Sequence, residues 1–539
     1  MAHSRLRYSR SSVGLAILMA FVLSIVAFSP DLQVDAQGTN VTFKIGPGFT
    51  DVTPHQIVRT LSDRVFIFAA QAQYSSVLVG YWTTAAGLPS ASSDFNGTAT
   101  VTEPTDNIVS VDAVYDGGTM IHVLINTRSG AVKDYPFNTA TNAFKTAISL
   151  TTDGGTISGD YIGTVGISGM FDKSGQLHVS HWTSSNRIVH QVYNYNSSNN
   201  TLSAVGGATT VDTAGHANHP ALAVSPKDNS VTIAWVSEAN LPTGTILART
   251  RSAGGAWGAV ETVSKSDAWT STISGINIDQ GPSLLIGGDG TKYISYIQDY
   301  DTTGAYGRVH FASSSVSGTW ADSAVSIAGT NAQLVINGST YTHDPALTIN
   351  ASGQLYNIGH GPMQTGVNTN MYTMQRNANG TWAVPSLFKI GSTVNDFDAS
   401  ASTKWSAVGF NRPNTYEFAF FRAPSGQYNS AELWYGRFGD NSSPATGLGA
   451  PVRNYYTTAT PQLTWNRITW ATGYQIEVAQ TNLFGASVVF TNPNPYPSTT
   501  LSASPSLTDG IYYWHVRAKK LDGTWSNWSI TEQFEVNAH

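Results

Sequence analysis

Aspartate and histidine residues recur in this chain just before short apolar runs, in the segments predicted to connect one group of strands to the next. Carboxylates and imidazoles form directional hydrogen bonds with sugar hydroxyls, and tryptophan rings stack on the apolar face of a sugar. The pattern therefore predicts a glycan-binding site on the face of the molecule where these connections meet. Four further candidates are expected at the ends of second strands, whose turns into the third strands share a face with these connections. The ten candidate ligand-binding residues are Asp160, His181, Trp182, His219, Asp279, Asp299, His343, Asp344, His360 and Asp398, of which His181, Trp182, Asp299 and His360 are the strand-end ones.

Each of these residues also has a purely structural explanation. An aspartate or histidine before a proline, as in Asp344-Pro345 and His219-Pro220, ends a loop and bonds nearby backbone N–H groups. Both explanations remain open from the sequence.

The sequence contains no complete motif for binding a metal or a cofactor. Asp396 and Asp398 have the spacing of an acid–base pair or of part of a calcium loop, but the remaining calcium ligands are missing. His178 and His181 have a zinc-like spacing, yet residues three apart on a strand point to opposite sides. We therefore expect no metal and no cofactor.

The composition predicts an all-β protein. Of the 539 residues only 12% are charged, against about 25% in an average chain, while 50 are glycine and none is cysteine. These values exclude a disordered chain, a coiled coil and a thiolate metal site. The net charge of −6 and the lack of a basic run after the first ten residues argue against nucleic acid as a partner.

The N-terminal segment has the pattern of a secretory signal peptide. Arg5 and Arg10 precede the apolar run Val13–Phe28, which is shorter than the roughly 20 residues of a spanning helix, and Val34–Ala36 offers small residues for cleavage. We expect residues 1–36 to be removed, leaving a secreted or cell-surface protein of a bacterium with no transmembrane span. An uncleaved N-terminal anchor is the alternative.

A unit of roughly 50 residues recurs along the mature chain, and each copy has the pattern of four short strands. The clearest copy runs from His219 to Val263. A fixed period of this length is typical of a β-propeller with four-stranded blades. We therefore predict a seven-bladed propeller for residues 38–440. The alternative is a propeller of six blades in which the irregular first unit is an insertion. The other copies begin near Gln56, Asn107, Asp160, Gly281, Asp344 and Asp396.

The last unit lacks one strand. It supplies strands at 400–410, 416–422 and 432–438, and the orphan segment Val41–Gly46 resembles the fourth strand of the preceding unit, Phe388–Gly391. We expect the N-terminal strand to complete the last blade and close the propeller, because an open ring leaves exposed sheet edges.

A second domain follows a polar linker at 441–450. Residues 451–539 contain Pro461-x-Leu463-x-Trp465 and the stretch Trp525-Ser-Asn-Trp528-Ser, and they resemble a fibronectin type III domain. The resemblance implies a β-sandwich that acts as a spacer or an adhesive module.

One turn motif resembles the Asp-box of sialidases. In Thr250-x-Ser252-x-Gly254-x-x-Trp257 a serine stands where that family has aspartate. The resemblance implies a degenerate sialidase-like propeller in which the box is a structural turn, on the face opposite the interblade loops.

A sialidase also needs three converging arginines, a tyrosine nucleophile paired with glutamate, and an acid/base aspartate. The family's early Arg-Ile-Pro motif has no match in this chain, so we favour a protein without catalysis that binds a glycan or other surface polymer. A diverged sialidase-like glycoside hydrolase and a structural or adhesive surface component are the alternatives. The arginines outside any family motif are Arg59, Arg187, Arg249, Arg308, Arg376 and Arg422.

Overall fold

The structure is a computed structural model, and its description covers the β-rich parts of residues 41–538. Within some of the ranges given below, one or two residues at a time are left out. The predicted signal peptide and linker lie outside the described residues. The described ranges are 41–46, 53–155, 166–264, 281–299, 306–314, 319–324, 335–337, 346–349, 355–361, 370–376, 382, 386–387, 394–401, 415–424, 431–439, 455–465, 472–519, 525–529 and 531–538.

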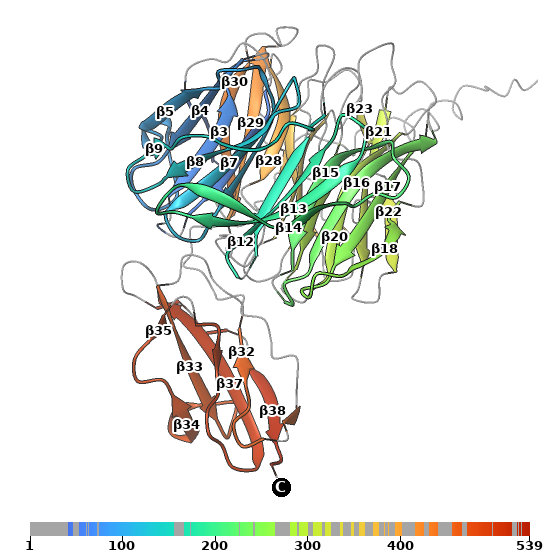
Figure 1. The fold of residues 1–539 in the computed structure, drawn as a ribbon. Coiled ribbons are helices and arrows are strands. Elements are labelled where there is room, and N and C mark those ends of the chain that lie inside the picture. The colour runs from blue at the N-terminus through green and yellow to red at the C-terminus, as the bar shows by residue number, and fades with distance from the viewer. Residues whose placement is uncertain are drawn as a thin grey trace, which may run out of the picture. The chain divides into compact units, whose positions relative to one another are not determined.

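The described residues form an all-β structure (Figure 1), as predicted. Seven sheets within residues 41–439 share one plan, in which four strands pair antiparallel in the order first, second, third, fourth. We number these sheets 1 to 7 along the chain. Sheet 1 contains β2 (His55–Arg59), β3 (Val65–Ala70), β4 (Val77–Trp82) and β5 (Gly97–Thr102). Sheet 2 contains β6 (Ile108–Tyr115), β7 (Met120–Thr127), β8 (Val132–Asn138) and β10 (Ile148–Thr151), with β9 (Ala143–Phe144) also on β8.

The next three sheets follow the same order. Sheet 3 contains β11 (Ile167–Phe171), β12 (Gln176–Trp182), β13 (Ile188–Asn196) and β14 (Thr201–Thr210). Sheet 4 contains β15 (Ala217–Val224), β16 (Val231–Asn240), β17 (Thr243–Arg251) and β18 (Trp257–Thr262). Sheet 5 contains β19 (Ser283–Ile286), β20 (Lys292–Asp299), β21 (Tyr306–Ser314) and β22 (Trp320–Ala324), with β23 (Val335–Asn337) also on β21.

The last two sheets complete this part of the chain. Sheet 6 contains β24 (Ala346–Ile349), β25 (Leu355–Gly361), β26 (Asn370–Gln375) and β27 (Ser386–Leu387). Sheet 7 contains β28 (Val394–Ala401), β29 (Thr415–Pro424), β30 (Glu432–Gly439) and, as its fourth strand, β1 (Val41–Lys44).

The N-terminal strand completes sheet 7, as predicted. β1 runs antiparallel to β30, with Phe43 opposite Tyr435. The rings of these two residues lie 5.1 Å apart, and Lys44 Nζ lies 2.7 Å from a carboxylate oxygen of Glu432. The first strand of this sheet begins at Val394, whereas the sequence predicted it at 400–410. The prediction was wrong because the aspartates at 396 and 398 were assigned to a loop, and both belong to the strand.

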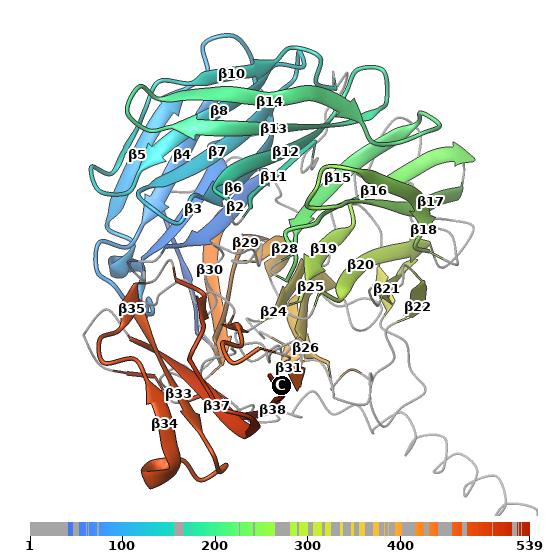
Figure 2. The same cartoon turned by 60° about the horizontal axis from the view of Figure 1, so that its bottom comes forward.

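The sheets are arranged in a propeller-like manner. Each first strand packs beside the first strand of the next sheet, in the order β2, β6, β11, β15, β19, β24 and β28, and β28 also packs beside β2. Figure 2 shows first strands such as β6 and β11 toward the inside and fourth strands such as β10 and β14 toward the outside.

A repeated hydrogen bond joins neighbouring first strands. In each case a serine hydroxyl on one first strand accepts a hydrogen bond from a backbone N–H of the next sheet's first strand or of the residue just before it. This contact satisfies a buried donor that the ladder within the sheet leaves unpaired. The three pairs are Ser110 with Gly166 (2.9 Å), Ser168 with Leu222 (3.0 Å) and Ser283 with Leu347 (2.9 Å).

The tryptophans of the Gly-x-Trp turns pack against the preceding sheet. They join adjacent sheets through ring contacts or an indole hydrogen bond. The contacts are Trp257 edge-on to His190 (5.4 Å), Trp320 Nε1 to the Glu261 carboxylate (2.8 Å) and Trp382 edge-on to Phe311 (5.2 Å).

The C-terminal part has its own sheets and its own core. Trp465, Tyr474 and Trp514 belong to a buried cluster drawn only from residues 463–536. The Arg517 guanidinium lies over the rings of Trp525 (4.8 Å) and Trp528 (4.3 Å), in a ladder-like stack of an arginine between two tryptophans. The strands are β31 (Tyr455–Tyr456), β32 (Leu463–Thr464), β33 (Gly473–Ala479), β34 (Val488–Thr491), β35 (Tyr496–Pro497), β36 (Ser502–Ala503), β37 (Gly510–Lys519) and β38 (Glu532–Val536).

Helices are minor elements of this structure. The short 3-10 helices η1 (Ser92–Asp94) and η3 (Gly485–Ser487) are single turns. Over the described residues, no helix has the length and apolar character needed to span a membrane.

Candidate functional site

The connections between sheets lie beside the turns between second and third strands. The backbone N–H of Gly154, between sheets 2 and 3, donates to Gly130 O in the turn between β7 and β8 (2.9 Å). Ser184 N–H, in the turn between β12 and β13, donates to Asp153 O (3.1 Å). The two kinds of loop therefore share one face, as predicted, and we call it the interblade face. Its described segments around sheets 2 and 3 are 103–107, 127–133, 151–155, 181–187 and 211–217.

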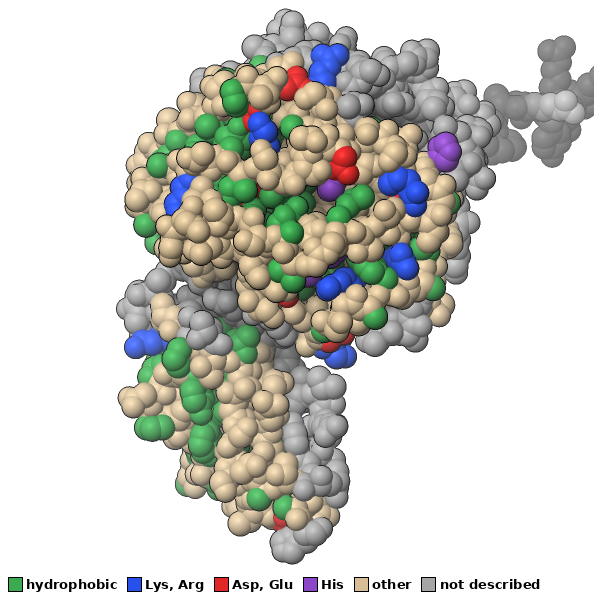
Figure 3. Space-filling model, in the orientation of Figure 1, with side chains coloured by type: hydrophobic (Ala, Val, Ile, Leu, Met, Phe, Trp, Pro, Cys, Tyr) green, Lys and Arg blue, Asp and Glu red, His purple; other side chains and the backbone are tan. Residues whose placement is uncertain are grey.

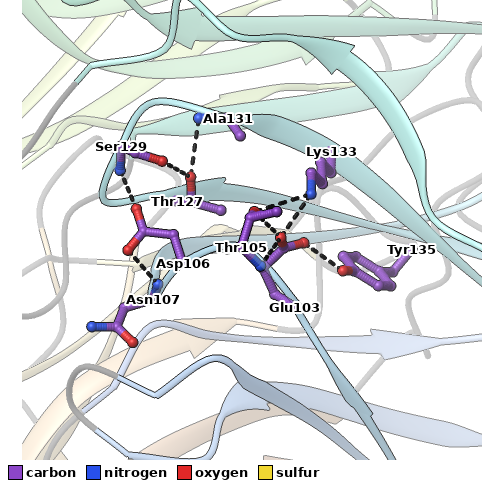
Figure 4. Close-up of polar contacts among 9 residues, drawn as sticks. All are labelled: Glu103, Thr105, Asp106, Asn107, Thr127, Ser129, Ala131, Lys133 and Tyr135. Carbon is purple, nitrogen blue, oxygen red and sulfur yellow. Dashed lines mark hydrogen bonds and ion pairs between the residues drawn. The ribbon is translucent and has the colours of Figure 1, made fainter.

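Carboxylates in the connection between sheets 1 and 2 hold loops in place (Figure 4). Asp106 accepts hydrogen bonds from the backbone N–H groups of Asn107 (2.7 Å) and Ser129. Glu103 is buried and accepts from Lys133 Nζ (2.7 Å) and Tyr135 Oη (2.5 Å). Burial by itself would raise the pKa of Glu103, but these donors, with Thr105, hold it below its ordinary value. Asp106, a loop aspartate that bonds backbone N–H groups, thus has a structural role.

A histidine–aspartate pair joins sheet 3 to the connection that precedes it. His181 Nε2, near the end of β12, lies 3.0 Å from Asp153 Oδ1, which also accepts from Thr151 Oγ1 (2.6 Å). The His181 side chain is 6% exposed and that of Asp153 is 57% exposed. Burial lowers the pKa of His181, an effect that Asp153 only partly opposes. The hydroxyl of Thr151 and the imidazole hold the pKa of Asp153 below its ordinary value, against the effect of burial. At neutral pH the pair is an uncharged imidazole that orients an ionised, solvent-facing carboxylate.

Trp182 ends β12 next to this pair and is half-buried. Its carbonyl accepts from Gly155 N–H (2.7 Å), and a Cβ added to Gly155 would lie 2.2 Å from the indole ring. Only glycine fits over this ring. The indole N–H has no hydrogen-bond partner. The indole therefore packs against Gly155 and a hydrophobic cluster of sheets 2 to 4, with its N–H buried.

Asn126 lies beneath the same connection. It is 0% exposed, and neither its Nδ2 nor its Oδ1 has a hydrogen-bond partner. A Cβ added to Gly154 would lie 2.8 Å from Oδ1, and one added to Gly166 would lie 3.1 Å from Nδ2. The amide therefore lies against Gly154 and Gly166, closed off from solvent.

Two candidates expected in loops lie in strands instead. His219 belongs to β15, where the pairing register shifts between Asn218 and Ala221, and its φ is 51°. Asp398 belongs to β28, at a register shift between Phe397 and Ala399. The loop prediction was wrong because both residues occupy bulges, which leave polar residues inside a strand.

The other candidates are only partly described. Asp299 and His360 lie at the ends of β20 and β25, where second strands reach the interblade face, but their side chains are outside the described part of the chain, as is that of Asp398. His181 and Trp182 are consecutive at the end of β12, and β15, which carries His219, packs beside β11 and β12. The candidates Asp160, Asp279, His343 and Asp344 lie outside the described residues.

The described arginines have structural contacts in five different sheets. Arg187 bonds Asp212 (2.7 Å), and Arg249 bonds the carbonyls of Gly258 and Val211 (2.7 and 3.0 Å). Arg376 and Arg422 lie over aromatic rings, and Arg59 pairs with Glu417. The Arg308 side chain is outside the described part. Within the described residues, these arginines form no convergent cluster.

A tyrosine–glutamate pair does exist, on the opposite face. Tyr435 Oη donates to Glu417 Oε1 (2.6 Å), and Arg59 binds the same carboxylate. Arg59 ends β2 and Glu417 lies near the start of β29, both at the turns between first and second strands. All three side chains are buried, and burial raises the pKa of Tyr435 well above its ordinary value. A buried phenol with a raised pKa is a poor nucleophile, so this cluster has a structural role.

The sequence prediction missed Asp153 and Asn126. Asp153 begins an Asp-Gly-Gly stretch that has the pattern of an ordinary turn, and its partner His181 lies 28 positions away. Asn126 is one polar residue at the end of an apolar strand and carries no sequence signal of its own.

Comparisons with known proteins find similarity to solved structures and none at the level of sequence families. No family model matches the chain, and no curated protein is similar to it. The SapL1 lectin, solved in complex with alpha methyl fucoside, is 12% identical over 63% of this chain and 97% of its own, with a TM-score of 0.34. The GH93 alpha-L-arabinofuranosidase of Fusarium graminearum is 12% identical over 74% and 98%, with a TM-score of 0.35. The NanB sialidase from Streptococcus pneumoniae is 14% identical over 74% and 70%, with a TM-score of 0.39. Likeness this weak decides neither function nor ligand.

Proposed function

We propose that this chain is a secreted or cell-surface protein of a bacterium that binds a glycan or other surface polymer without catalysis. Residues 38–440 form the binding propeller, and residues 451–539 form a fibronectin type III-like spacer. The observation that carries the proposal is the solvent-exposed Asp153 carboxylate that His181 orients on the interblade face, at the end of the strand that carries the half-buried Trp182. Oriented carboxylates and partly exposed aromatic rings are common groups in sugar-binding sites.

A seven-bladed propeller is the architecture that we propose for residues 38–440. The seven sheets with neighbouring first strands support it. The irregular first unit, treated as an insertion in the six-bladed alternative, corresponds to the regular sheet β2–β5. The pairing of β1 with β30 supports closure by the N-terminal strand.

The arginine contacts support binding over sialidase-like hydrolysis. Every described arginine among the candidates has a structural contact, and the Tyr435–Glu417 pair is buried on the opposite face. The hydrolase alternative predicts turnover of a panel of fluorogenic glycosides, with loss of turnover in Asp344→Asn or Asp398→Asn. Turnover of this kind would replace the binding proposal.

A glycan array tests the proposal directly. The secreted chain, residues 37–539, is applied to plant, bacterial and animal glycans. We expect retention on a defined subset, and weaker retention of a Trp182→Ala variant on the same subset. If the folded chain binds no glycan on such an array, the proposal fails, and self-association measured by sedimentation would favour the structural or adhesive alternative.

A further inference from the structure

The fourth strand of each of the seven sheets is an edge strand, since over the described residues it pairs on one side only. An open edge invites pairing with a further strand, and proteins protect such edges with a charged residue, a bulge or a very short strand. Charged side chains are scattered singly over the described surface (Figure 3), so protection of an edge depends largely on the residues of its own strand.

Six of the seven fourth strands that the structure describes have such a protection. Lys44 in β1, Glu261 in β18 and Asp322 in β22 are charged. The pairing register shifts along β10 and β14, and β27 has two residues. β5 is the exception among these strands. It contains no charged residue and no proline, and all six of its residues continue one register opposite β4 without a bulge.

The threonines of β5 turn their backbone groups toward the open side of the strand. The N–H of Glu103, just after β5, donates to Ser76 O on the β4 side (2.7 Å). Because successive residues of a paired strand direct their N–H and C=O groups to opposite sides, those of Thr98, Thr100 and Thr102 point away from β4. The three side chains are exposed, and β5 lies at the outer rim in Figures 1 and 2. Within the described part of the chain, no hydrogen bond reaches these outward groups.

The residues of β5 are complementary to those of an identical strand. In an antiparallel pair about a twofold axis at Thr100, this residue lies opposite its own counterpart, and Thr98 lies opposite Thr102. Each such pair exchanges two backbone hydrogen bonds, and the opposed threonine side chains share the exposed face. Ala99 and Val101 stay on the other face, packed against the core of sheets 1 and 2. Neither strand carries a charge, so no like-charge repulsion opposes the pairing.

From this arrangement we propose that two copies of this chain associate through β5, which continues the sheet from one copy into the other across a twofold axis. The paired edge is about 20 Å long, so the interface is smaller than the standard size and the dimer is weak. A dimer presents two interblade faces and binds a repetitive surface polymer at two points, which raises its overall affinity. The inference goes beyond the proposed function and does not depend on it.

Sedimentation velocity of residues 37–539, measured without any glycan, tests the association. We expect a monomer at low concentration and a growing fraction of dimer as the concentration rises. A chain that stays monomeric up to roughly 0.5 mM overturns the inference. Because no glycan is present, either result leaves the outcome of the glycan array unaffected.

A charge at the axis tests which surface is used. Thr100→Lys places two like charges opposite each other and should abolish the dimer. Its melting temperature should match that of the parent chain, because Thr100 is exposed. Ser203→Lys is the matched control, since Ser203 is exposed on β14, whose edge is already protected by a register shift. The control should dimerise like the parent chain, and a dimer that persists in Thr100→Lys overturns the inference.

Mixed variants test the twofold pairing itself. Thr100→Lys and Thr100→Glu should each be monomeric alone, because each places like charges at the axis. Mixed in equal amounts they should form a heterodimer, because opposite charges then face each other across the two strands. Formation of the heterodimer also shows that both variants are folded. A mixture that stays monomeric overturns the pairing about Thr100.

Discussion

Arg59 and Glu417 form a buried, two-point ion pair between sheet 1 and sheet 7, although 358 positions separate them in the chain. The guanidinium also donates to Gly87 O (3.0 Å), and Tyr435 donates to the same carboxylate (2.6 Å). The Arg59 side chain is 0% exposed and that of Glu417 is 3% exposed. The pair therefore joins the first and last sheets at a place that is closed to bulk solvent.

Breaking this pair should destabilise the propeller strongly. Arg59→Met keeps most of the side-chain volume but leaves a buried carboxylate without its partner, at an expected cost of about 3–5 kcal/mol. The measurement is the free energy of unfolding in denaturant. Lys44→Met is the control, because the Lys44–Glu432 pair is about one third exposed on both sides and should contribute less than about 1 kcal/mol. Equal losses in the two variants would contradict this assignment.

Removing the N-terminal strand should destabilise the propeller even more. Deletion of residues 38–49 exposes the edge of β30 and removes the packing of Phe43 on Tyr435. We expect the thermal transition of residues 38–440 to fall by more than ten degrees, with light scattering showing association through the open edge. An unchanged transition would mean that β1 is dispensable for closure.

Two tryptophans on opposite faces should respond differently to truncation. Trp182→Ala removes the stacking surface and should lower glycan affinity at least tenfold, with a modest effect on stability because the ring is only half-buried. Trp257→Ala removes a contact between sheets 3 and 4 and should lower the melting temperature with little effect on affinity. The checks are isothermal titration and calorimetry on both variants, and the reverse pattern would place the ligand on the other face.

Stability should fall in mild acid because of a buried histidine. Burial, and then the charges of His178 and Arg251, lower the pKa of His190 to about 3. In the unfolded chain the pKa is about 6.5, so the unfolded state takes up the proton first, and stability is lost as the pH falls from about 6.5 toward 3. This group alone should cost about 2 kcal/mol between pH 6.5 and 5.

A variant isolates this contribution. His190→Gln keeps a neutral hydrogen-bonding partner for His178, whose Nδ1 lies 3.0 Å from His190 Nε2. Denaturant midpoints measured at pH 5 and pH 7 should differ less in the variant than in the parent chain. The same difference in both proteins would show that other groups dominate the acid response.

Much of the architecture was predictable because it is encoded locally. Apolar alternation and Gly, Asn and Asp turns mark each four-stranded unit, so the predicted unit starts near Gln56 and Asn107 agree with β2 and β6. The closing strand was predictable by counting, since the last unit was one strand short. Bulges were not predictable, because a bulge depends on the partner strand, and His219 and Asp398 were therefore misplaced in loops.

The sequence by itself determined the all-β class, the repeating unit and the scarcity of charge, because each follows from residue types and their spacing along the chain. Only the tertiary structure decided which polar residues are used by the fold and which stay open to solvent. Asp106 and Asp153 look alike in the sequence, yet one binds backbone N–H groups and the other stays open to solvent. The physical reason is that hydrogen-bond satisfaction is set by the neighbouring sheet, whose residues lie tens to hundreds of positions away in the chain.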